Sequence, residues 1–108
     1  MQKIKLKISP ETLFLLQNIE NKYANLPAMS RVDRIQKSIR WELFQKLSRS
    51  CIAYTTNPNG KPRTIELNYH LAHRLFDDIV FTLVQRIFGF YEANLLEMLK
   101  NELYQKLL

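Results

Sequence analysis

The sequence predicts a mostly helical α+β domain in the order β-α-α-β-α-α, with its two strands paired as a short antiparallel ribbon. Two segments, 3–8 and 64–69, alternate between polar and apolar side chains, as strands with one buried face do. Each is followed by two segments whose apolar residues recur at helical spacing. The chain has 108 residues and is 46% hydrophobic, which is enough for one domain with a core. We therefore expect a single domain, 1–108, with β-α-α halves at 1–53 and 63–108 joined by loop 54–62.

The first strand separates lysines from aliphatic residues. Three aliphatic side chains point to the core and three lysines form a row on the opposite face: Ile4, Leu6 and Ile8 against Lys3, Lys5 and Lys7. A row of ammonium groups on a rigid element suits a polyanion such as nucleic acid. The alternative is an edge strand that carries lysines to prevent aggregation.

The two helices that follow have recognisable starts. Ser9 can cap the first helix, with Pro10 at its first position, and that helix runs to about residue 24. Ser30 caps the second helix, with Asp33 at the capping-box position. One apolar stripe is expected to bury the second helix; it consists of Val32, Ile35, Ile39, Leu43 and Leu47.

The second half begins after a loop rich in turn residues, 57–62. In the second strand Ile65, Leu67 and Tyr69 are expected to face inward. The third helix, from about 70 to 88, is apolar around most of its circumference, which is typical of a central buried helix. The fourth helix runs from about residue 90 to the end.

The two halves echo each other in sequence. Segment 39–47 is similar to segment 99–107 at an offset of 60, and Ile4 and Leu6 correspond to Ile65 and Leu67 at an offset of 61. This echo indicates an internal pseudo-two-fold repeat. The alternative is a chance similarity, because amphipathic helices are built from few residue types.

Positive charge is concentrated in the first part of the chain. Residues 1–63 hold twelve Lys or Arg and four acids, a net charge of +8, whereas residues 64–108 hold four bases and six acids, a net charge of −2. These sums give the total of +6. Such asymmetry favours a localised anionic partner.

Composition excludes several classes of protein. Two glycines, Gly60 and Gly89, cannot form a glycine-rich phosphate loop, so no nucleotide cofactor is expected. The single cysteine, Cys51, excludes an intramolecular disulfide, fits a reducing compartment and is expected to be a packed, neutral thiol. No secretory leader is recognisable, and the most apolar stretch, 79–90, is too short to span a bilayer. We expect a soluble, cytoplasmic protein with no membrane partner.

The first 50 residues resemble a ribbon-helix-helix DNA-binding domain. The similar parts are the alternating strand 3–8, the helix start Ser9-Pro10-Glu11 and the polar opening of the second helix, 30–40. In that family the strand pairs with a two-fold mate and the ribbon enters the major groove. The resemblance implies that the strand lysines face bases or phosphates, and that Ser30 and Arg31 hold phosphate. Because this chain has a second strand of its own, a ribbon within one chain and a ribbon between two chains both remain open.

The second helix also carries a mixed basic and aromatic face. Arg34, Lys37, Trp41 and Phe44 lie opposite the apolar stripe. Such a face can bind phosphates and stack on bases, or it can anchor a protein partner. The alternative is that Trp41 and Phe44 are covered by the fourth helix or by a second copy of the chain.

The third helix carries two further groups of residues with the chemistry of a functional site. His70, His73 and Asp77 share one helix face and have the residue types of metal ligands, but no second ligand cluster is evident, so no metal is expected. Arg86 falls on the apolar side of this helix and, if buried, needs a partner such as Glu97, Glu102 or a second subunit.

These observations lead to two hypotheses about function. The leading one is a small, basic, non-enzymatic DNA- or nucleic-acid-binding protein, such as a regulator of transcription or of a mobile element in a bacterium. The other is an interaction or assembly module, a homodimer included, whose interface holds Trp41, Phe44 and Arg86. An enzyme is not expected, because the motifs supply no set of nucleophile, base and orienting group.

Overall fold

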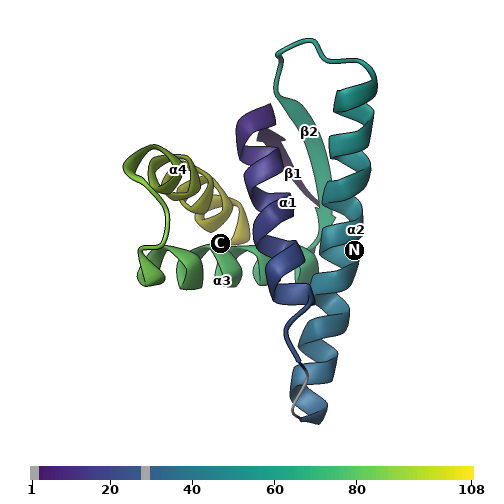
Figure 1. Ribbon diagram of the computed structural model, residues 1–108, viewed down its shortest axis with the longest axis vertical. Coiled ribbons are helices and arrows are strands. Elements are labelled where there is room, and N and C mark those ends of the chain that lie inside the picture. The colour runs from purple at the N-terminus through teal and green to yellow at the C-terminus, as the bar shows by residue number, and fades with distance from the viewer. Residues whose placement is uncertain (1–2, 28–29) are drawn as a thin grey trace.

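The computed structural model describes residues 3–27 and 30–108, and its elements follow the predicted order (Figure 1). Their bounds are β1 Lys3–Ile8, α1 Pro10–Ala24, α2 Arg31–Thr56, β2 Arg63–Asn68, α3 Tyr69–Gln85 and α4 Phe90–Leu107. The predicted fold class, mostly helical α+β with one two-stranded antiparallel sheet, is therefore confirmed.

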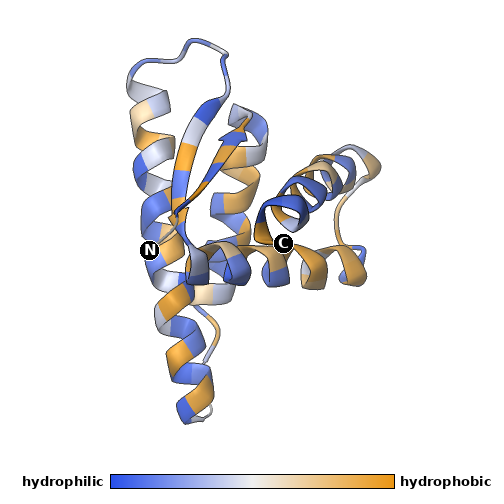
Figure 2. Cartoon of the chain, turned by 180° about the vertical axis from the view of Figure 1, so that it is seen from behind, coloured by the Kyte–Doolittle hydropathy of each residue, from blue (hydrophilic) through white to orange (hydrophobic). Residues whose placement is uncertain are grey.

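The ribbon forms within one chain. β1 and β2 pair antiparallel, with Lys5 opposite Glu66 and Leu6 opposite Ile65. The aliphatic residues of both strands are buried, whereas the alternate residues of β1 are exposed. The ribbon lies behind α1 in Figure 1 and in front of it in Figure 2, so its outer face is open on the side of the molecule opposite α1.

Both serine caps are confirmed. The Ser9 side chain accepts a hydrogen bond from the Thr12 amide at 3.3 Å, and the Ser30 side chain accepts one from the Asp33 amide at 3.1 Å. These bonds satisfy amides that the first turn of a helix leaves unpaired. Local sequence signals therefore set the starts of α1 and α2.

The apolar stripe of α2 is buried only in part. Leu43 and Leu47 are fully buried against the rest of the chain, but Val32 and Ile35 are exposed, so their prediction as core residues was wrong. The physical reason is length, because α1 has 15 residues and α2 has 26. The first turns of α2 extend beyond the end of α1 (Figure 1), and in the described part of the chain Val32 and Ile35 stay exposed there.

The third helix is amphipathic rather than buried all round. Its inner face packs in the core, whereas Phe81 and Val84 on its outer side are more than half exposed. It also ends at Gln85, three residues earlier than predicted. Tyr69 was expected to face inward from the strand but opens α3 and is 45% exposed, because β2 ends at Asn68, opposite Lys3.

The core lies between the inner face of the ribbon and the four helices. Its largest fully buried side chains are Leu6, Ile8, Leu13, Leu16, Leu43, Leu47, Leu67, Leu71, Leu75, Ile79, Leu96 and Leu103. Cys51 is buried beside them, and this burial raises the pKa of its thiol. The prediction of a packed, neutral cysteine is therefore confirmed.

Candidate nucleic-acid interface

The outer face of the ribbon presents the predicted lysine row. Lys3, Lys5 and Lys7 are all exposed, each next to a buried aliphatic residue. The neighbouring strand contributes Glu66, whose carboxylate lies 3.6 Å from Lys5 Nζ and 4.0 Å from Lys3 Nζ. The centre of the ribbon is therefore partly neutralised, and Lys7, which lies opposite Thr64, is outside these two ion pairs.

Two further lysines reach the ribbon from the flanking helices. Lys46 Nζ on α2 donates a hydrogen bond to the Glu66 carbonyl at 3.1 Å, and Lys106 Nζ on α4 donates one to the Lys5 carbonyl. Both carbonyls belong to the same cross-strand pair and point away from the ribbon, one from each edge. We name Lys3, Lys5, Lys7, Lys46 and Lys106 the ribbon lysines.

The ribbon lysines outnumber the acids among them. Glu66 lies between Lys3 and Lys5, and Glu102 lies 3.4 Å from Lys106 on α4. Five ammonium groups against these two carboxylates leave a local charge of +3. Lys46 and Lys106 were not predicted from the sequence, because only the packing of α2 and α4 against the strand edges places them here.

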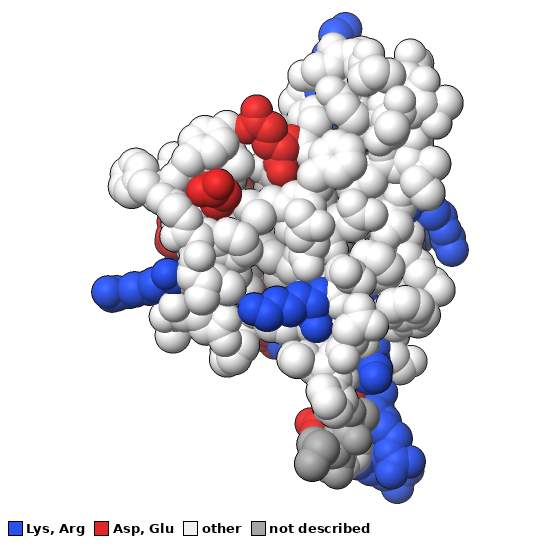
Figure 3. All heavy atoms as spheres, in the orientation of Figure 1, with Lys and Arg blue, Asp and Glu red and all other residues white. Residues whose placement is uncertain are grey.

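The other predicted phosphate-binding group lies elsewhere on the molecule. The Ser30 hydroxyl is engaged in capping α2, and Arg31 and Arg34 are exposed in its first turns. Lys46, which contacts the ribbon, is fifteen residues after Arg31, so the two lie about 22 Å apart along the helix axis. In Figure 3 basic side chains gather where α2 begins, at the lower end of the molecule. The structure thus separates this group from the ribbon lysines.

The mixed face of α2 is partly open. Trp41 and Phe44 stack with ring centroids 5.4 Å apart and an angle of 28° between their planes. Trp41 is 45% exposed, so the predicted covering by another helix of the same chain does not occur for this ring. Trp41 also lines a hollow of about 390 Å³ together with Arg34 and Lys37. These three predicted residues therefore meet at one place.

Arg86 is not a buried arginine. It is exposed and ends α3 in a left-handed conformation, with φ of 54°. Its proposed partners are engaged elsewhere, because Glu97 pairs with Lys100 and Glu102 pairs with Lys106. The prediction was wrong because α3 ends before Arg86, so that the helical periodicity that placed this residue inward no longer applies.

The histidines of α3 have separate neighbours. His70 Nε2 lies 3.8 Å from Glu42, the His73 ring meets Tyr69 edge-on at 4.4 Å, and Asp77 lies 3.8 Å from Arg74. Within residues 3–27 and 30–108 no group of three or more His, Cys, Asp or Glu side chains is placed to hold a metal ion.

A buried polar cluster joins three helices and was not predicted. Asp78 on α3 is fully buried and accepts hydrogen bonds from Arg40 Nη2 at 2.9 Å and Nε at 3.2 Å. Arg74 Nη2 lies 3.1 Å from the same carboxylate, so two guanidinium groups share one buried acid. The neighbouring Asp77 is exposed, and the two aspartates do not converge.

Glu20 on α1 completes the buried cluster. Its side chain is fully buried, and neither carboxyl oxygen has a hydrogen-bond partner in the described part of the chain. Burial, and then the negative charge of Asp78, raise the pKa of Glu20 to about 10. Glu20 is therefore protonated at neutral pH, and the cluster ties α1, α2 and α3 together rather than forming an open site.

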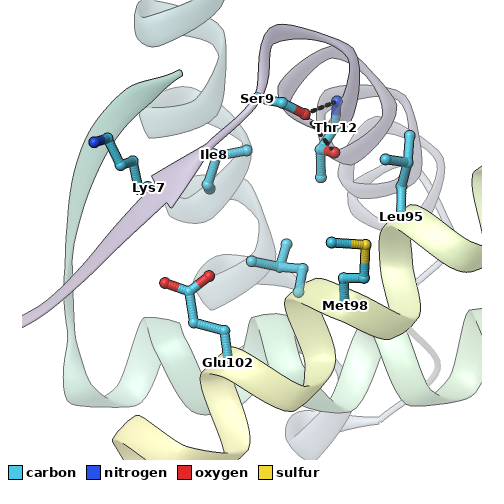
Figure 4. A pocket seen from close by; sticks show the side chains of 8 residues that line it. Lys7, Ile8, Ser9, Thr12, Leu95, Met98 and Glu102 are labelled. Carbon is cyan, nitrogen blue, oxygen red and sulfur yellow. Dashed lines mark hydrogen bonds between the residues drawn. The ribbon is translucent and has the colours of Figure 1, made fainter. Parts of the chain in front are cut away.

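A smaller pocket lies between the end of β1 and α4 (Figure 4). It has a volume of about 200 Å³, and Ile8, Leu95 and Met98 form much of its wall. The hydroxyls of Ser9 and Thr12 are hydrogen-bonded to each other at 2.8 Å. These hydroxyls are thus already partnered, and the pocket offers a ligand mainly apolar contacts.

No helix in the described ranges is both long enough and apolar enough to cross a lipid bilayer. Comparison of the chain with protein-family models, with curated proteins and with solved structures finds no match.

Proposed function

We propose that this chain is a small, non-enzymatic nucleic-acid-binding protein that holds a phosphate backbone on the outer face of its ribbon. The observation that carries the proposal is the row of β1 lysines on that exposed face, together with a lysine from α2 and one from α4 at the two edges of the ribbon. Lysine is a compact point charge that suits phosphate, and phosphate contacts supply most non-specific affinity. Duplex DNA is the ligand we favour, with a role in the bacterial cytoplasm as a regulator of transcription or of a mobile element.

The ribbon face suits backbone contact better than base reading. Glu66 lies between Lys3 and Lys5, so the positive potential is lower at the centre of the ribbon than at Lys7. Phosphates would be held by the lysines around this centre. We therefore expect binding that depends steeply on salt and weakly on sequence.

Replacing the β1 lysines is the direct test of this function. The triple variant Lys3→Ala, Lys5→Ala, Lys7→Ala should bind duplex DNA more weakly, and each lost phosphate contact should shallow the log–log salt dependence by about one unit. The free energy of unfolding should stay within about 0.5 kcal/mol, since these side chains are exposed. Unchanged affinity and salt slope would contradict the proposal. The β1 lysines would then serve to prevent aggregation at the strand edge.

Two variants at the ribbon edge sharpen the test. Glu66→Gln removes a carboxylate from the face and should strengthen binding by up to about fivefold, the equivalent of about 1 kcal/mol for an exposed charge. Lys106→Ala should weaken it. Lys100→Ala is the matched control, because Lys100 is also on α4 but pairs with Glu97 instead of the ribbon. A Lys100 variant that weakens binding as much as Lys106→Ala would indicate a general charge effect.

An interaction module remains the second candidate, favoured by the hollow at Trp41. Trp and Arg are enriched among the residues that dominate protein interfaces, and here Trp41 and Arg34 line one concave surface. On this alternative Trp41→Ala should abolish capture of the partner, whereas the β1 triple variant should behave as the parent does. Light scattering with and without duplex DNA separates the two functions by the mass of the complex.

A further inference from the structure

The hollow at Trp41 lies between the end of α1 and the first half of α2. Its lining in the described part of the chain consists of Ala24, Asn25, Arg34, Lys37, Ser38 and Trp41. Trp41 lies seven residues after Arg34, with Lys37 between them, so the three side chains share one face of α2. The volume of about 390 Å³ is within the range of pockets that hold small ligands.

Trp41 contributes an exposed aromatic ring to this hollow. Its side chain is stacked on Phe44, yet 45% of Trp41 remains exposed. Phe44 lies about one turn further along α2 and is not among the residues that line the hollow. Phe44 therefore holds the indole in place without closing the space in front of it, and the exposed part of the ring can receive a second flat group.

The charge around the hollow is positive. Within residues 3–27 and 30–108 neither Arg34 nor Lys37 forms an ion pair, and no acid is among the lining residues. Asp33, the acid that precedes Arg34, lines a neighbouring hollow that shares only Lys37 with this one among the described residues. Two cations beside one aromatic ring complement a ligand that combines a flat ring system with negative charge.

We infer that this hollow binds an unpaired nucleotide of a single-stranded nucleic acid, with the base on Trp41 and the phosphates at Arg34 and Lys37. The inference rests on the proposed function and adds a second site to it. Every base has a π-face, so stacking on an aromatic side chain, combined with basic groups along the backbone, holds a single strand without reading its sequence.

The composition of the lining favours a nucleotide over a protein partner. The centre of a protein interface is depleted of charged residues, lysine included. Trp41 and Ala24 are the apolar residues of the described lining, and the other four are polar or basic. A protein interface centred here would bury two cations with little apolar area, whereas a nucleotide uses both the ring and the cations.

The hollow is separate from the ribbon lysines. Lys46, which contacts the ribbon, follows Lys37 by nine residues, or about two and a half turns of α2. The two lysines therefore lie on opposite sides of the helix, and the hollow opens on the side away from the ribbon contact. Binding of a single strand at the hollow and of a duplex on the ribbon can thus be tested independently.

Trp41 is the only tryptophan of the chain, so its fluorescence reports directly on the hollow. The test uses the β1 triple variant, which lacks the three lysines of β1. A short oligothymidylate should quench this fluorescence because its bases stack on the indole, whereas an abasic oligonucleotide of the same length should not. In fluorescence anisotropy with labelled oligothymidylate, Trp41→Ala should raise the dissociation constant about tenfold or more. Trp41→Phe, which keeps a ring, should raise it less.

Substitution of the two cations tests the phosphate contacts. Arg34→Ala and Lys37→Ala should each shallow the log–log salt dependence of single-strand binding by about 0.7 units. Lys61→Ala is the matched control, because Lys61 is exposed in the loop that follows the other end of α2, and this variant should bind as the parent does. Circular dichroism and Tm check that each variant is folded.

Three results would overturn the inference: fluorescence that oligothymidylate leaves unchanged, equal quenching by the abasic oligonucleotide, or an equal loss of binding in Lys61→Ala. A folded Trp41→Ala variant that binds the single strand normally but loses self-association in light scattering would assign the hollow to a protein interface and would also overturn it. Duplex binding by the parent and by the β1 triple variant is measured separately. Failure of the ribbon function and failure of the single-strand site are therefore distinguishable.

Discussion

Asp78 is the buried acid that balances two arginines. Its carboxylate accepts hydrogen bonds from Arg40 and lies 3.1 Å from Arg74, with no exposure to solvent. Removing one partner from a buried ion pair leaves an uncompensated charge, which is far more costly than losing a surface pair.

Asp78→Asn should lower the free energy of unfolding by about 3 kcal/mol, because Arg40 and Arg74 would lose their buried counter-charge. Urea denaturation at neutral pH measures this change. The adjacent Asp77→Asn is the control: Asp77 is exposed, so its replacement should cost no more than about 0.5 kcal/mol. Equal effects at the two positions would show that the buried pair contributes no special stability.

Glu20 makes the stability of the same cluster depend on pH. Its pKa is about 10 in the folded chain, against 4.5 for an ordinary glutamate. Below pH 4.5 the folded and unfolded chains both carry this proton. Between these two values the unfolded chain releases the proton and the folded chain keeps it. Stability from this group is therefore complete at acid pH and is lost as the pH rises toward 10.

We expect the free energy of unfolding to fall between pH 5 and pH 9, with a slope of up to about 1.4 kcal/mol per pH unit from Glu20. Glu20→Gln should flatten this slope and make the chain more stable than the parent at pH 8, because a side-chain amide does not ionise in this pH range. Denaturant titrations at several pH values measure the slope. A Glu20→Gln variant that kept the slope of the parent would contradict the assignment.

At the scale of single elements, the two halves of α2 differ in burial. Its second half packs in the core through Leu43, Leu47 and Cys51, whereas no residue of segment 31–40 is buried. The apolar stripe is continuous in sequence but meets a partner only where α1 and the ribbon lie beside it. Burial, rather than pattern, determines which part of the stripe stabilises the fold.

Alanine substitutions along α2 should therefore differ sharply. Leu47→Ala should lower the free energy of unfolding by about 2–5 kcal/mol, because it leaves a cavity at a fully buried position. Ile35→Ala should change it by no more than about 0.5 kcal/mol, because Ile35 is 52% exposed and alanine is a good helix former. Thermal or urea unfolding of both variants measures the difference, and a large loss at Ile35 would show that another chain covers this end of α2.

The strands and most helix boundaries were predictable from the sequence because their signals are local. Alternation identified β1 and β2, and the serine caps identified the starts of α1 and α2. The errors at Val32, Ile35 and Arg86 have a different origin. Each depended on how far a neighbouring element extends or where a helix ends, and neither property is encoded in the periodicity of the residue's own segment.

At the scale of the whole molecule, the candidate site also combines residues predictable from local sequence with residues that only tertiary packing brings there. Lys3, Lys5 and Lys7 follow from the period of one strand, so their exposure was predictable. Lys46 and Lys106 are 60 residues apart in sequence and lie on different helices, and only tertiary packing places them at one ribbon. The cluster of Glu20, Arg40 and Asp78 likewise draws one residue from each of three helices, so no single segment carries its signal.

The register of the ribbon agrees with the sequence echo. Positions 5 and 66, which the offset of 61 makes equivalent, are also cross-strand partners. Ile4 lies opposite Leu67, and Leu6 lies opposite Ile65, so the pairing is symmetric about the Lys5–Glu66 pair. The helices do not share this symmetry in length, since α2 has 26 residues and α4 has 18. The two halves thus have equivalent strands and unequal helices.

The ribbon also determines the order in which the chain can fold. Its strands join residues as far apart as Lys3 and Asn68, 65 positions along the chain, whereas α1 and α2 are neighbours in sequence. Closing a long loop costs entropy before its contacts form, so the α1–α2 hairpin is expected to form early and the ribbon late. In a chevron analysis Leu16→Ala should mainly slow folding, and Ile65→Val should mainly accelerate unfolding.

A late ribbon has a consequence for the lysine face. Lys46 reaches its carbonyl partner only after β2 has packed beside α2, and Lys106 reaches its partner only after α4 has packed beside β1. A growing chain on the ribosome can form the α1–α2 hairpin while residues 63–108 are still being made, but it has no ribbon face. The paired ribbon that we propose as the nucleic-acid surface therefore forms only after residues 63–108 have been made.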